Sequence, residues 1–371
     1  MRILHLADLH LGWQPEFLGE KKEERTRERD NFLRRAVDFA LDSRNRIHVV
    51  LIAGDLFEVH NPSRPLVEMA LSQLQRLVKN NIFLLTVPGN HDEITYHDSV
   101  YRAEAHRWPG YLATSPMPRE IARLELDGKT TSFYGMAYTG GLTKTSPPLE
   151  TFPKEEADRH VAVLHGSLDW DTGDRSMPIS SAAVAGSGYD CLAMGHIHRF
   201  STRFLGKTTA CYAGAVEAKT FHDPGTGMFT VLSLGESVNV ERVDAACRLY
   251  QTKELDLNLC DTFEDVARTI AQWADPQLIL RIVLKGQVNY RVDPAALQEA
   301  NAHLFYHLQV DSEGVYLDLD SLASLAGEPT IRGYFTKRLL ARLEGEEDDT
   351  EIDMIKKALT RGIAALRGGG E

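Results

Sequence analysis

The stretch VVLIAGD at residues 49–55 decides the fold of this chain. Five apolar residues without alternation are typical of a strand buried on both faces, and this run ends abruptly at a glycine and an aspartate. Two further runs have the same form: ILHLA at 3–7 stops at Asp8, and IFLLTV at 82–87 stops before Pro88 and the polar string GNHD. The sequence therefore predicts three buried strands with polar residues at their carboxyl ends.

Helical patterns separate these three strands. Apolar residues recur at helical spacing within residues 23–44 and again within residues 64–80. The order strand, helix, strand, helix, strand predicts parallel strands joined by helical crossovers, with ligands bound beyond the carboxyl ends. Residues 122–243 contain several further strand patterns, so we expect an α/β fold built as a β-sandwich flanked by helices.

Polar clusters of one kind follow five of the predicted strands. They contain carboxylate and amide oxygens together with imidazole nitrogens, a donor set that suits hard or borderline divalent ions. The clusters are Asp8-Leu9-His10, Gly54-Asp55, Gly89-Asn90-His91-Asp92, His165-Gly166 and Gly195-His196-Ile197-His198. One histidine at a strand end is more often a hydrogen-bonded structural residue, and GNHD alone fits a turn. Five such clusters in one chain instead predict a two-metal phosphoesterase.

The clusters supply enough donors for two divalent ions that share one carboxylate. We assign Asp55 as the shared carboxylate. The first ion takes Asp8, His10 and His198, and the second takes Asn90, His165 and His196.

His91 adjoins Asn90, so its side chain should point elsewhere while it stays close to the site. We predict that it donates a proton to the leaving oxygen or stabilises charge on the phosphate oxygens. Asp92 is expected to orient this imidazole, as carboxylates commonly do.

The pattern changes near residue 246, and we expect three parts. Residues 1–246 form the phosphoesterase domain, residues 247–326 a small α/β capping domain whose first helix is capped by Asp261, and residues 327–371 a helical tail. One face of the last helix carries Ile352, Ile355, Leu359, Ile363 and Leu366. This face either packs on its own domain or docks a partner.

Composition limits the function without naming it. A net charge of −12 argues weakly against a simple nucleic-acid-binding surface, although two divalent ions would add about four positive charges at the site. The start lacks a signal-peptide pattern, no apolar run is long enough to span a bilayer, and the four cysteines show no CxxC pairing. We therefore expect a cytoplasmic protein with reduced thiols and no membrane partner.

Longer strings around the clusters resemble a known family. ILHLADLHLG at 3–12, AGDLFEVHNPS at 53–63, VPGNHD at 87–92 and MGHIH at 194–198 are similar to motifs of the calcineurin-like metallophosphoesterases, in particular the SbcD and YhaO type of DNA-repair exonuclease. The segment AGAVEAKTFHDPG at 213–225 resembles the one that follows the last motif in these nucleases. The resemblance covers residues 1–245 and, more loosely, the α/β module and the tail.

The resemblance implies a phosphodiesterase that uses two Mn²⁺ ions, with Mg²⁺ as the alternative. It implies 3′-to-5′ exonuclease and single-strand endonuclease activity on DNA in break processing. It also implies that the α/β module faces DNA and that the partner is an SMC-like coiled-coil ATPase, of the SbcC type or its YhaO-branch equivalent. The seven assigned ligands and His91 fall on the family's metal-binding and catalytic positions.

Two departures separate the chain from this family. The family often has a histidine directly after the GDLF string, where this chain has Glu58, and we expect a carboxylate there to repel a phosphate backbone. The family's homodimer uses apolar helices after the second and third motifs, whereas residues 94–108 are largely polar. Homodimerisation by this route is therefore left open.

Two other functions fit the same residues. One is hydrolysis of small phosphodiesters or phosphomonoesters by the same fold, and the other is a scaffold for the ATPase with weak activity. The added module and tail favour a large substrate, while the intact ligand set argues against a scaffold.

Overall fold

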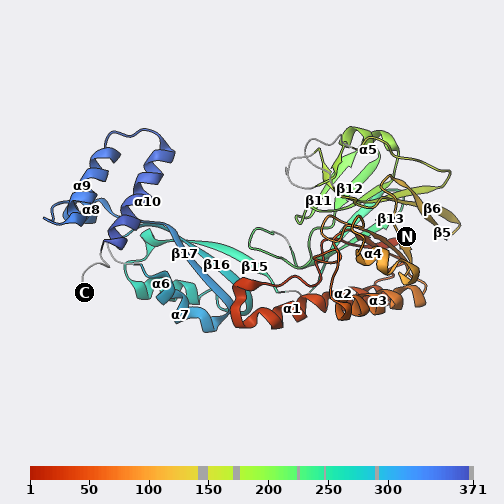
Figure 1. The fold of residues 1–371 in the computed structure, drawn as a ribbon, viewed down its shortest axis with the longest axis horizontal. Coiled ribbons are helices and arrows are strands. Elements are labelled where there is room, and N and C mark those ends of the chain that lie inside the picture. Colours follow the sequence, from red (N-terminus) through yellow and green to blue (C-terminus); the bar gives the residue numbers. More distant parts are fainter. Residues whose placement is uncertain (141–148, 170–175, 224–225, 246–247, 289–291, 367–371) are drawn as a thin grey trace. The chain divides into compact units, whose positions relative to one another are not determined.

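The computed structural model describes residues 1–140, 149–169, 176–223, 226–245, 248–288 and 292–366 (Figure 1). The chain divides into two compact units, Met1–Arg248 and Leu249–Glu371. The three functional parts expected from the sequence remain a prediction.

The first unit contains two six-stranded sheets, and the first of them has the order β14-β13-β1-β2-β3-β4. Its strands are β1 (Arg2–Leu6), β2 (Val49–Ala53), β3 (Phe83–Val87), β4 (Tyr111–Leu112), β13 (Met228–Leu234) and β14 (Val238–Asp244). Strands β1, β2 and β3 are parallel neighbours, as predicted. Their carboxyl ends therefore meet at one edge of the sheet.

The second sheet has the order β11-β12-β10-β7-β6-β5. Its strands are β5 (Arg119–Leu126), β6 (Lys129–Gly135), β7 (Arg159–His165), β10 (Cys191–Gly195), β11 (Ser201–Leu205) and β12 (Thr208–Tyr212), and a small separate pair is β8 (Ser167–Leu168) with β9 (Pro178–Ile179). The β5–β6 hairpin turns through Asp127 and Gly128, which both have positive φ angles. Strands β7 and β10 are parallel, so His165 and Gly195 lie side by side at the ends of the two strands.

Alternating side chains bury both faces of the first sheet. In β1, Ile3 belongs to the core between the two sheets, whereas Leu4 belongs to the core beneath the helices. The helices of this unit are α1 (Lys22–Asp30), α2 (Phe32–Leu41), α3 (Arg64–Lys79), α4 (Val100–Ala103) and α5 (Ser181–Ser187). Helices α2 and α3 pack on the outer face of the first sheet, and Val184 of α5 packs on the second (Figure 1). The result is the predicted β-sandwich flanked by helices.

The second unit is built on a parallel three-stranded sheet of order β15-β16-β17. Its elements are β15 (Tyr250–Asp256), α6 (Phe263–Ala271), β16 (Asp275–Val288), α7 (Pro294–Asn301), β17 (Phe305–Leu317), α8 (Leu319–Ala326), α9 (Ile331–Leu343) and α10 (Asp349–Ala365). The prediction that Asp261 caps the first helix is wrong, because Thr262 is the N-cap and its hydroxyl accepts from the amide of Asp265.

The apolar face of α10 packs within the second unit. Ile355, Leu359 and Ile363 are buried in one cluster with Leu322 and Leu325 of α8. Of the two alternatives for this face, packing on its own domain is confirmed. Ile355 and Leu359 are therefore not exposed for contact with a partner. Among the described residues, no helix is both long and apolar enough to cross a membrane.

Candidate metal centre

The predicted ligands stand at or just beyond the carboxyl ends of strands, where the backbone turns sharply. Four of them, Asp8, His10, Asp55 and His196, have positive φ angles of 54°, 49°, 51° and 93°. Residues other than glycine rarely adopt this left-handed conformation, which costs free energy and persists where the surrounding structure fixes it. Such strain gathers at functional sites, and here it turns side chains from separate strands toward one place.

Glycines of the same clusters make room for these side chains. A Cβ atom on Gly54 would lie 2.1 Å from Nδ1 of His165, and one on Gly89 would lie 2.2 Å from Oδ1 of Asp55. Both distances are far inside van der Waals contact. The glycine beside each polar residue is therefore required by close approach of the chain rather than by the turn alone.

Asp8, His10 and His198 form what we call the first half of the site. One possible ligand atom from each lies within 4.8 Å of the others. The Nε2 atoms of His10 and His198 face each other at 3.1 Å, although 188 residues separate them in the chain. The amide of His196 donates to both carboxylate oxygens of Asp8, at 3.0 and 3.2 Å, and so holds that side chain in place.

Asn90, His165 and His196 form the second half. Oδ1 of Asn90 lies 2.9 Å from Nε2 of His165 and 3.0 Å from Nδ1 of His196. Asp55 lies between the halves, with Oδ2 3.4 Å from Nε2 of His165 and 3.7 Å from Nε2 of His10. The structure thus brings all seven predicted residues together, and Asp55 has the central position that a shared carboxylate needs.

The donor set fits divalent cations. Asp8 and Asp55 are both buried, and burial together with the charge of Asp55 raises the pKa of Asp8. Burial also lowers the pKa of His10 to about 3, so this imidazole is neutral near pH 7, the form that binds metal. Buried carboxylates beside imidazoles, with their donor atoms converging, make a site that suits a divalent cation.

Three imidazoles have an oxygen beside Nδ1: in His165 and His198 the contact is a hydrogen bond, and in His10 it is an ion-pair contact. Nδ1 of His10 lies 2.9 Å from Oε2 of Glu58, and Nδ1 of His198 lies 3.0 Å from Oδ1 of Asp223. Nδ1 of His165 lies 2.9 Å from the carbonyl oxygen of Ala53. These oxygens accept and do not donate, so Nδ1 carries a proton and Nε2 of each ring points into the site. Burial lowers the pKa of His165, but the carboxylate of Asp55 outweighs it and raises that pKa to about 9.

Glu58 and Asp223 were not among the residues predicted from the sequence to support the ligands. The available signals were weak: Glu58 stands just after the second cluster, and Asp223 lies in the string at 213–225. Burial raises the pKa of each, but the contacts with His10 and Lys219 lower that of Glu58 to about 2, and His198 with two backbone amides lowers that of Asp223 to about 2. Both are therefore carboxylates at neutral pH.

Glu58 is also paired with a cation. Nζ of Lys219 lies 2.9 and 2.8 Å from its two carboxylate oxygens. The charge of Glu58 is therefore balanced, and the expected repulsion of a phosphate backbone stays a prediction.

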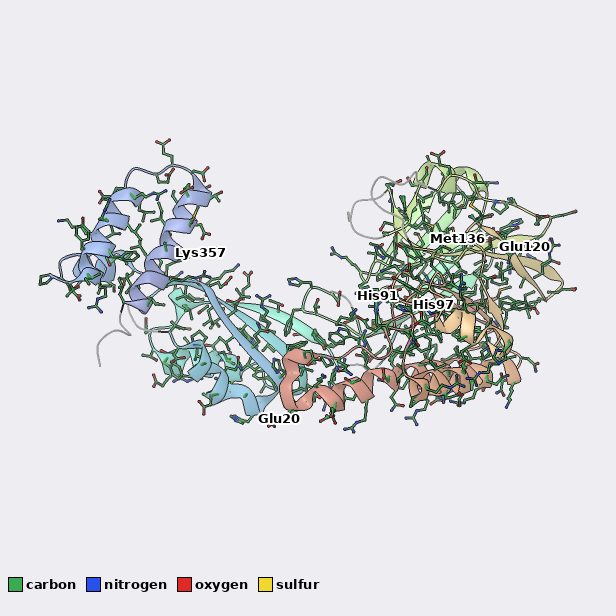
Figure 2. All side chains as sticks on the ribbon, viewed as in Figure 1. Glu20, His91, His97, Glu120, Met136 and Lys357 are labelled. Carbon is green, nitrogen blue, oxygen red and sulfur yellow. The ribbon has the colours of Figure 1, made fainter. Side chains whose placement is uncertain are left out.

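His91 lies beside the two halves, at the margin of the first unit (Figure 2). Its ring packs edge-on against that of His10, with centroids 4.6 Å apart, and its side chain is 37% exposed. Its amide donates to Oδ1 of Asp55 at 2.9 Å, and its Nδ1 lies 3.1 Å from the carbonyl oxygen of Glu58. His91 therefore orients the shared carboxylate with its backbone and keeps its side chain accessible.

Asp92 has partners other than the expected imidazole of His91. Its carboxylate accepts from the amides of Gly89 and Phe57 and from the hydroxyl of Tyr101, at 2.7, 3.1 and 2.7 Å. Burial, followed by the nearby charge of Asp55, raises the pKa of Asp92 to about 6. These contacts tie the loop that carries His91 to the loop after β2, whereas Nδ1 of His91 faces Glu58.

Comparison with known proteins gives the family. The model of the calcineurin-like phosphoesterase domain matches residues 1–200, more than half of the chain. The chain belongs to this family. It is therefore related to hydrolases that act on phosphoesters at a dinuclear metal site, which agrees with the clustered histidines and aspartates.

Curated proteins similar to this chain include YhaO and Mre11 proteins. They confirm the resemblance to the SbcD and YhaO type that the sequence motifs indicated. YhaO of Bacillus subtilis (strain 168), described as an uncharacterized metallophosphoesterase, is 24% identical over 304 residues, covering 77% of this chain and 72% of that protein. The DNA double-strand break repair protein Mre11 of Haloferax volcanii is 25% identical, over 80% of this chain and 64% of that protein. Mre11 of Methanopyrus kandleri is 26% identical, over 60% of this chain and 50% of that protein. The chain thus covers less than two thirds of these two Mre11 proteins.

Proposed function

We propose that this calcineurin-like phosphoesterase is a two-metal phosphodiesterase that degrades DNA. One observation carries the proposal: two sets of imidazole and oxygen donors converge on the buried carboxylate of Asp55, with the partly exposed side chain of His91 beside them. Mn²⁺ is the proposed ion and Mg²⁺ the alternative, because the mixed oxygen and nitrogen donors suit both borderline and hard ions.

Each residue then has a defined task. Asp8, His10 and His198 would hold one ion, Asn90, His165 and His196 the other, and Asp55 both. When bound, such a pair of ions neutralises the charge of the phosphate and activates a water molecule. The glycines and left-handed residues of the strand ends fix the ligands before the substrate arrives, so little reorganisation is needed during the reaction.

His91 is proposed as the residue that transfers a proton. Its Nδ1 lies against the carbonyl oxygen of Glu58, which can only accept, so Nδ1 keeps its hydrogen. Nε2 is then the atom that gains and releases a proton, and the protonated ring can donate it to the leaving oxygen. Asp92 contributes by holding the loop of His91 rather than through the ring.

DNA is proposed as the substrate because two of the relatives are named DNA double-strand break repair proteins, and the match to the one from Haloferax volcanii covers 80% of the chain. On the same grounds we propose 3′-to-5′ exonuclease and single-strand endonuclease activity, a DNA-facing role for residues 247–326, and an SMC-like coiled-coil ATPase as partner. Docking of that partner is assigned to residues 327–371 outside the buried face of α10.

The test is hydrolysis by the purified full chain with Mn²⁺ or Mg²⁺. End-labelled single- and double-stranded DNA and a p-nitrophenyl phosphodiester are offered in parallel. We expect Mn²⁺-dependent loss of DNA that disappears in Asp55→Ala and in His91→Ala. Turnover of the small diester with intact DNA would overturn the choice of substrate and favour a small-molecule phosphoesterase. Undiminished activity of Asp55→Ala would show that the assignment of the metal ligands is wrong.

A further inference from the structure

Lys219 and Glu58 form an ion pair directly behind His10, one of the proposed metal ligands. Oε2 of Glu58 lies 2.9 Å from Nδ1 of His10, and both carboxylate oxygens lie within 2.9 Å of Nζ of Lys219. The pair is largely buried, with side chains 23% and 14% exposed. In such surroundings two opposite charges in contact interact much more strongly than on an open surface.

The segment that carries Lys219 is fixed from several sides. Glu217 forms a buried ion pair with Arg25 of α1, and the carbonyl of Ala218 accepts from Arg29 at 2.9 Å. The ring of Trp13 lies 5.0 Å from the guanidinium of Arg29 and 6.0 Å from Nζ of Lys219. Lys219 is therefore held toward Glu58 by its backbone and its neighbours.

The same turn supports the second imidazole of the first half. Oδ2 of Asp223 accepts from the amides of Lys219 and Thr220, at 2.8 and 3.0 Å, while Oδ1 faces Nδ1 of His198 at 3.0 Å. Residues 219–223 thus deliver a cation toward Glu58 and a carboxylate to His198. The charges of this turn act on the two imidazoles whose Nε2 atoms face each other.

We propose that Glu58 and Lys219 are a matched positioning pair for the first half of the site: Glu58 orients His10 and favours a bound cation, and Lys219 cancels the charge that Glu58 would otherwise present to a phosphate. Neither residue is a proposed ligand. The inference rests on the proposed role of His10, and it explains how this chain accommodates a carboxylate directly after GDLF.

Removing the charge of Glu58 and removing the charge of Lys219 should change the affinity for one metal ion in opposite directions. Glu58→Gln keeps an oxygen beside Nδ1 of His10 but leaves the positive charge of Lys219 unbalanced, so affinity for one of the two ions should fall about tenfold. Lys219→Met leaves the negative charge unbalanced, so the affinity for that ion should rise about threefold while KM for the phosphodiester also rises. In the double variant Glu58→Gln/Lys219→Met, affinity should return to within about threefold of wild type.

The measurement is calorimetric titration of MnCl₂ into the EDTA-treated, dialysed full chain, with no DNA present. Asp311→Asn is the matched control, because Asp311 forms a similarly enclosed ion pair with Arg281, at 2.7 Å, in the second unit. It should leave both Mn²⁺ affinities unchanged. Circular dichroism establishes that every variant is folded before titration.

The outcomes separate this inference from the proposed function. If wild type binds two Mn²⁺ ions and Glu58→Gln binds them equally well, the positioning role is wrong while the site stands. If Lys219→Met weakens binding as Glu58→Gln does, the pair is a structural bridge only, and the charge argument is wrong. If wild type binds no Mn²⁺, the ligand assignment itself fails.

Discussion

Each half of the candidate metal centre combines two histidines with one side-chain oxygen donor, but the histidines are supported differently. In the first half, His10 and His198 each rest on a carboxylate, Glu58 and Asp223. In the second half, His165 rests on the carbonyl oxygen of Ala53, a backbone atom of β2. A carboxylate adds charge to the ring that it holds, whereas a carbonyl fixes the ring without adding a full charge. The first half is therefore open to tuning by side chains, whereas His165 of the second half is held by a backbone oxygen of the facing sheet.

This contrast has a structural cause. His165 is the last residue of β7 in the second sheet, and its ring reaches the main-chain oxygen of Ala53 at the end of β2 in the first sheet. His198 lies three residues beyond β10, and its support comes from the turn at 219–223. A ligand at the end of a strand can reach a main-chain oxygen of the facing sheet, whereas His198, on a loop, is supported by a side chain from another loop.

The largest expected loss of activity comes from replacing Asp55, the carboxylate that both halves share. Asp55→Asn should reduce the phosphodiesterase activity by at least about 10²–10³-fold, because one oxygen serves both halves. Titration with Mn²⁺ should show both binding events weakened. Loss of one event with the other unchanged would show that Asp55 belongs to one half and does not bridge.

A smaller effect should be confined to the second half. Gly54→Ala places a methyl group 2.1 Å from Nδ1 of His165 at a φ of +86°, so we expect a loss of about 2–4 kcal/mol of stability and weaker binding of one ion. Gly128→Ala is the matched control, since Gly128 has a φ of +71° with no atom within 4 Å of the new Cβ. It should cost about 1 kcal/mol. Urea denaturation measures both, and equal losses would contradict the role of close packing against His165.

Removing the charge of Asp223, which supports His198 in the first half, should have a still smaller effect on the site. Asp223→Asn keeps an oxygen for Nδ1 of His198 or for the amides of the turn but loses the charge, so affinity for one ion should fall about tenfold. The affinity for the other ion should stay within about twofold, since the second half does not depend on this turn. A uniform loss of both in the Mn²⁺ titration would mean that the halves are not separately supported.

The smallest expected effect comes from adding charge to the second half. Asn90→Asp replaces the neutral oxygen that faces His165 and His196 with a carboxylate, so binding of one Mn²⁺ ion should tighten by about threefold. KM for the phosphodiester should rise, because more negative charge surrounds the substrate phosphate. Tighter binding of both ions to the same extent would contradict the view that each half binds its own ion.

The fold of the first unit was predictable to a large extent from apolar runs. The runs at 49–53 and 82–87 have no polar interruption on either face except Thr86, and both became central strands of the first sheet. The helix expected over residues 23–44 is instead α1 and α2, which meet at Asn31. In the second unit the sequence did not predict β15 or α8, because Tyr250–Asp256 alternates weakly and α8 is only eight residues long.

The candidate ligands could be predicted from the sequence, but the residues that contact and orient them could not. Each predicted ligand follows an apolar strand within a few positions, so local sequence places it at the edge of a sheet. Glu58 and Lys219 are 161 residues apart, and no local pattern pairs a glutamate with a lysine over that distance. Asp92 shows the same limit, since its neighbour in sequence is His91 but its partners are Gly89, Phe57 and Tyr101.

The sequence by itself determined which side chains stand at the ends of the buried strands, because an apolar run must stop where the chain leaves the core. It thereby determined the candidate donors of the proposed metal centre and the phosphoesterase family. Only the tertiary structure decided which oxygen lies behind each imidazole, which cation balances Glu58, and that the apolar face of α10 is already covered. Those contacts join residues from distant parts of the chain, and they are set by how strands and loops pack rather than by any local pattern.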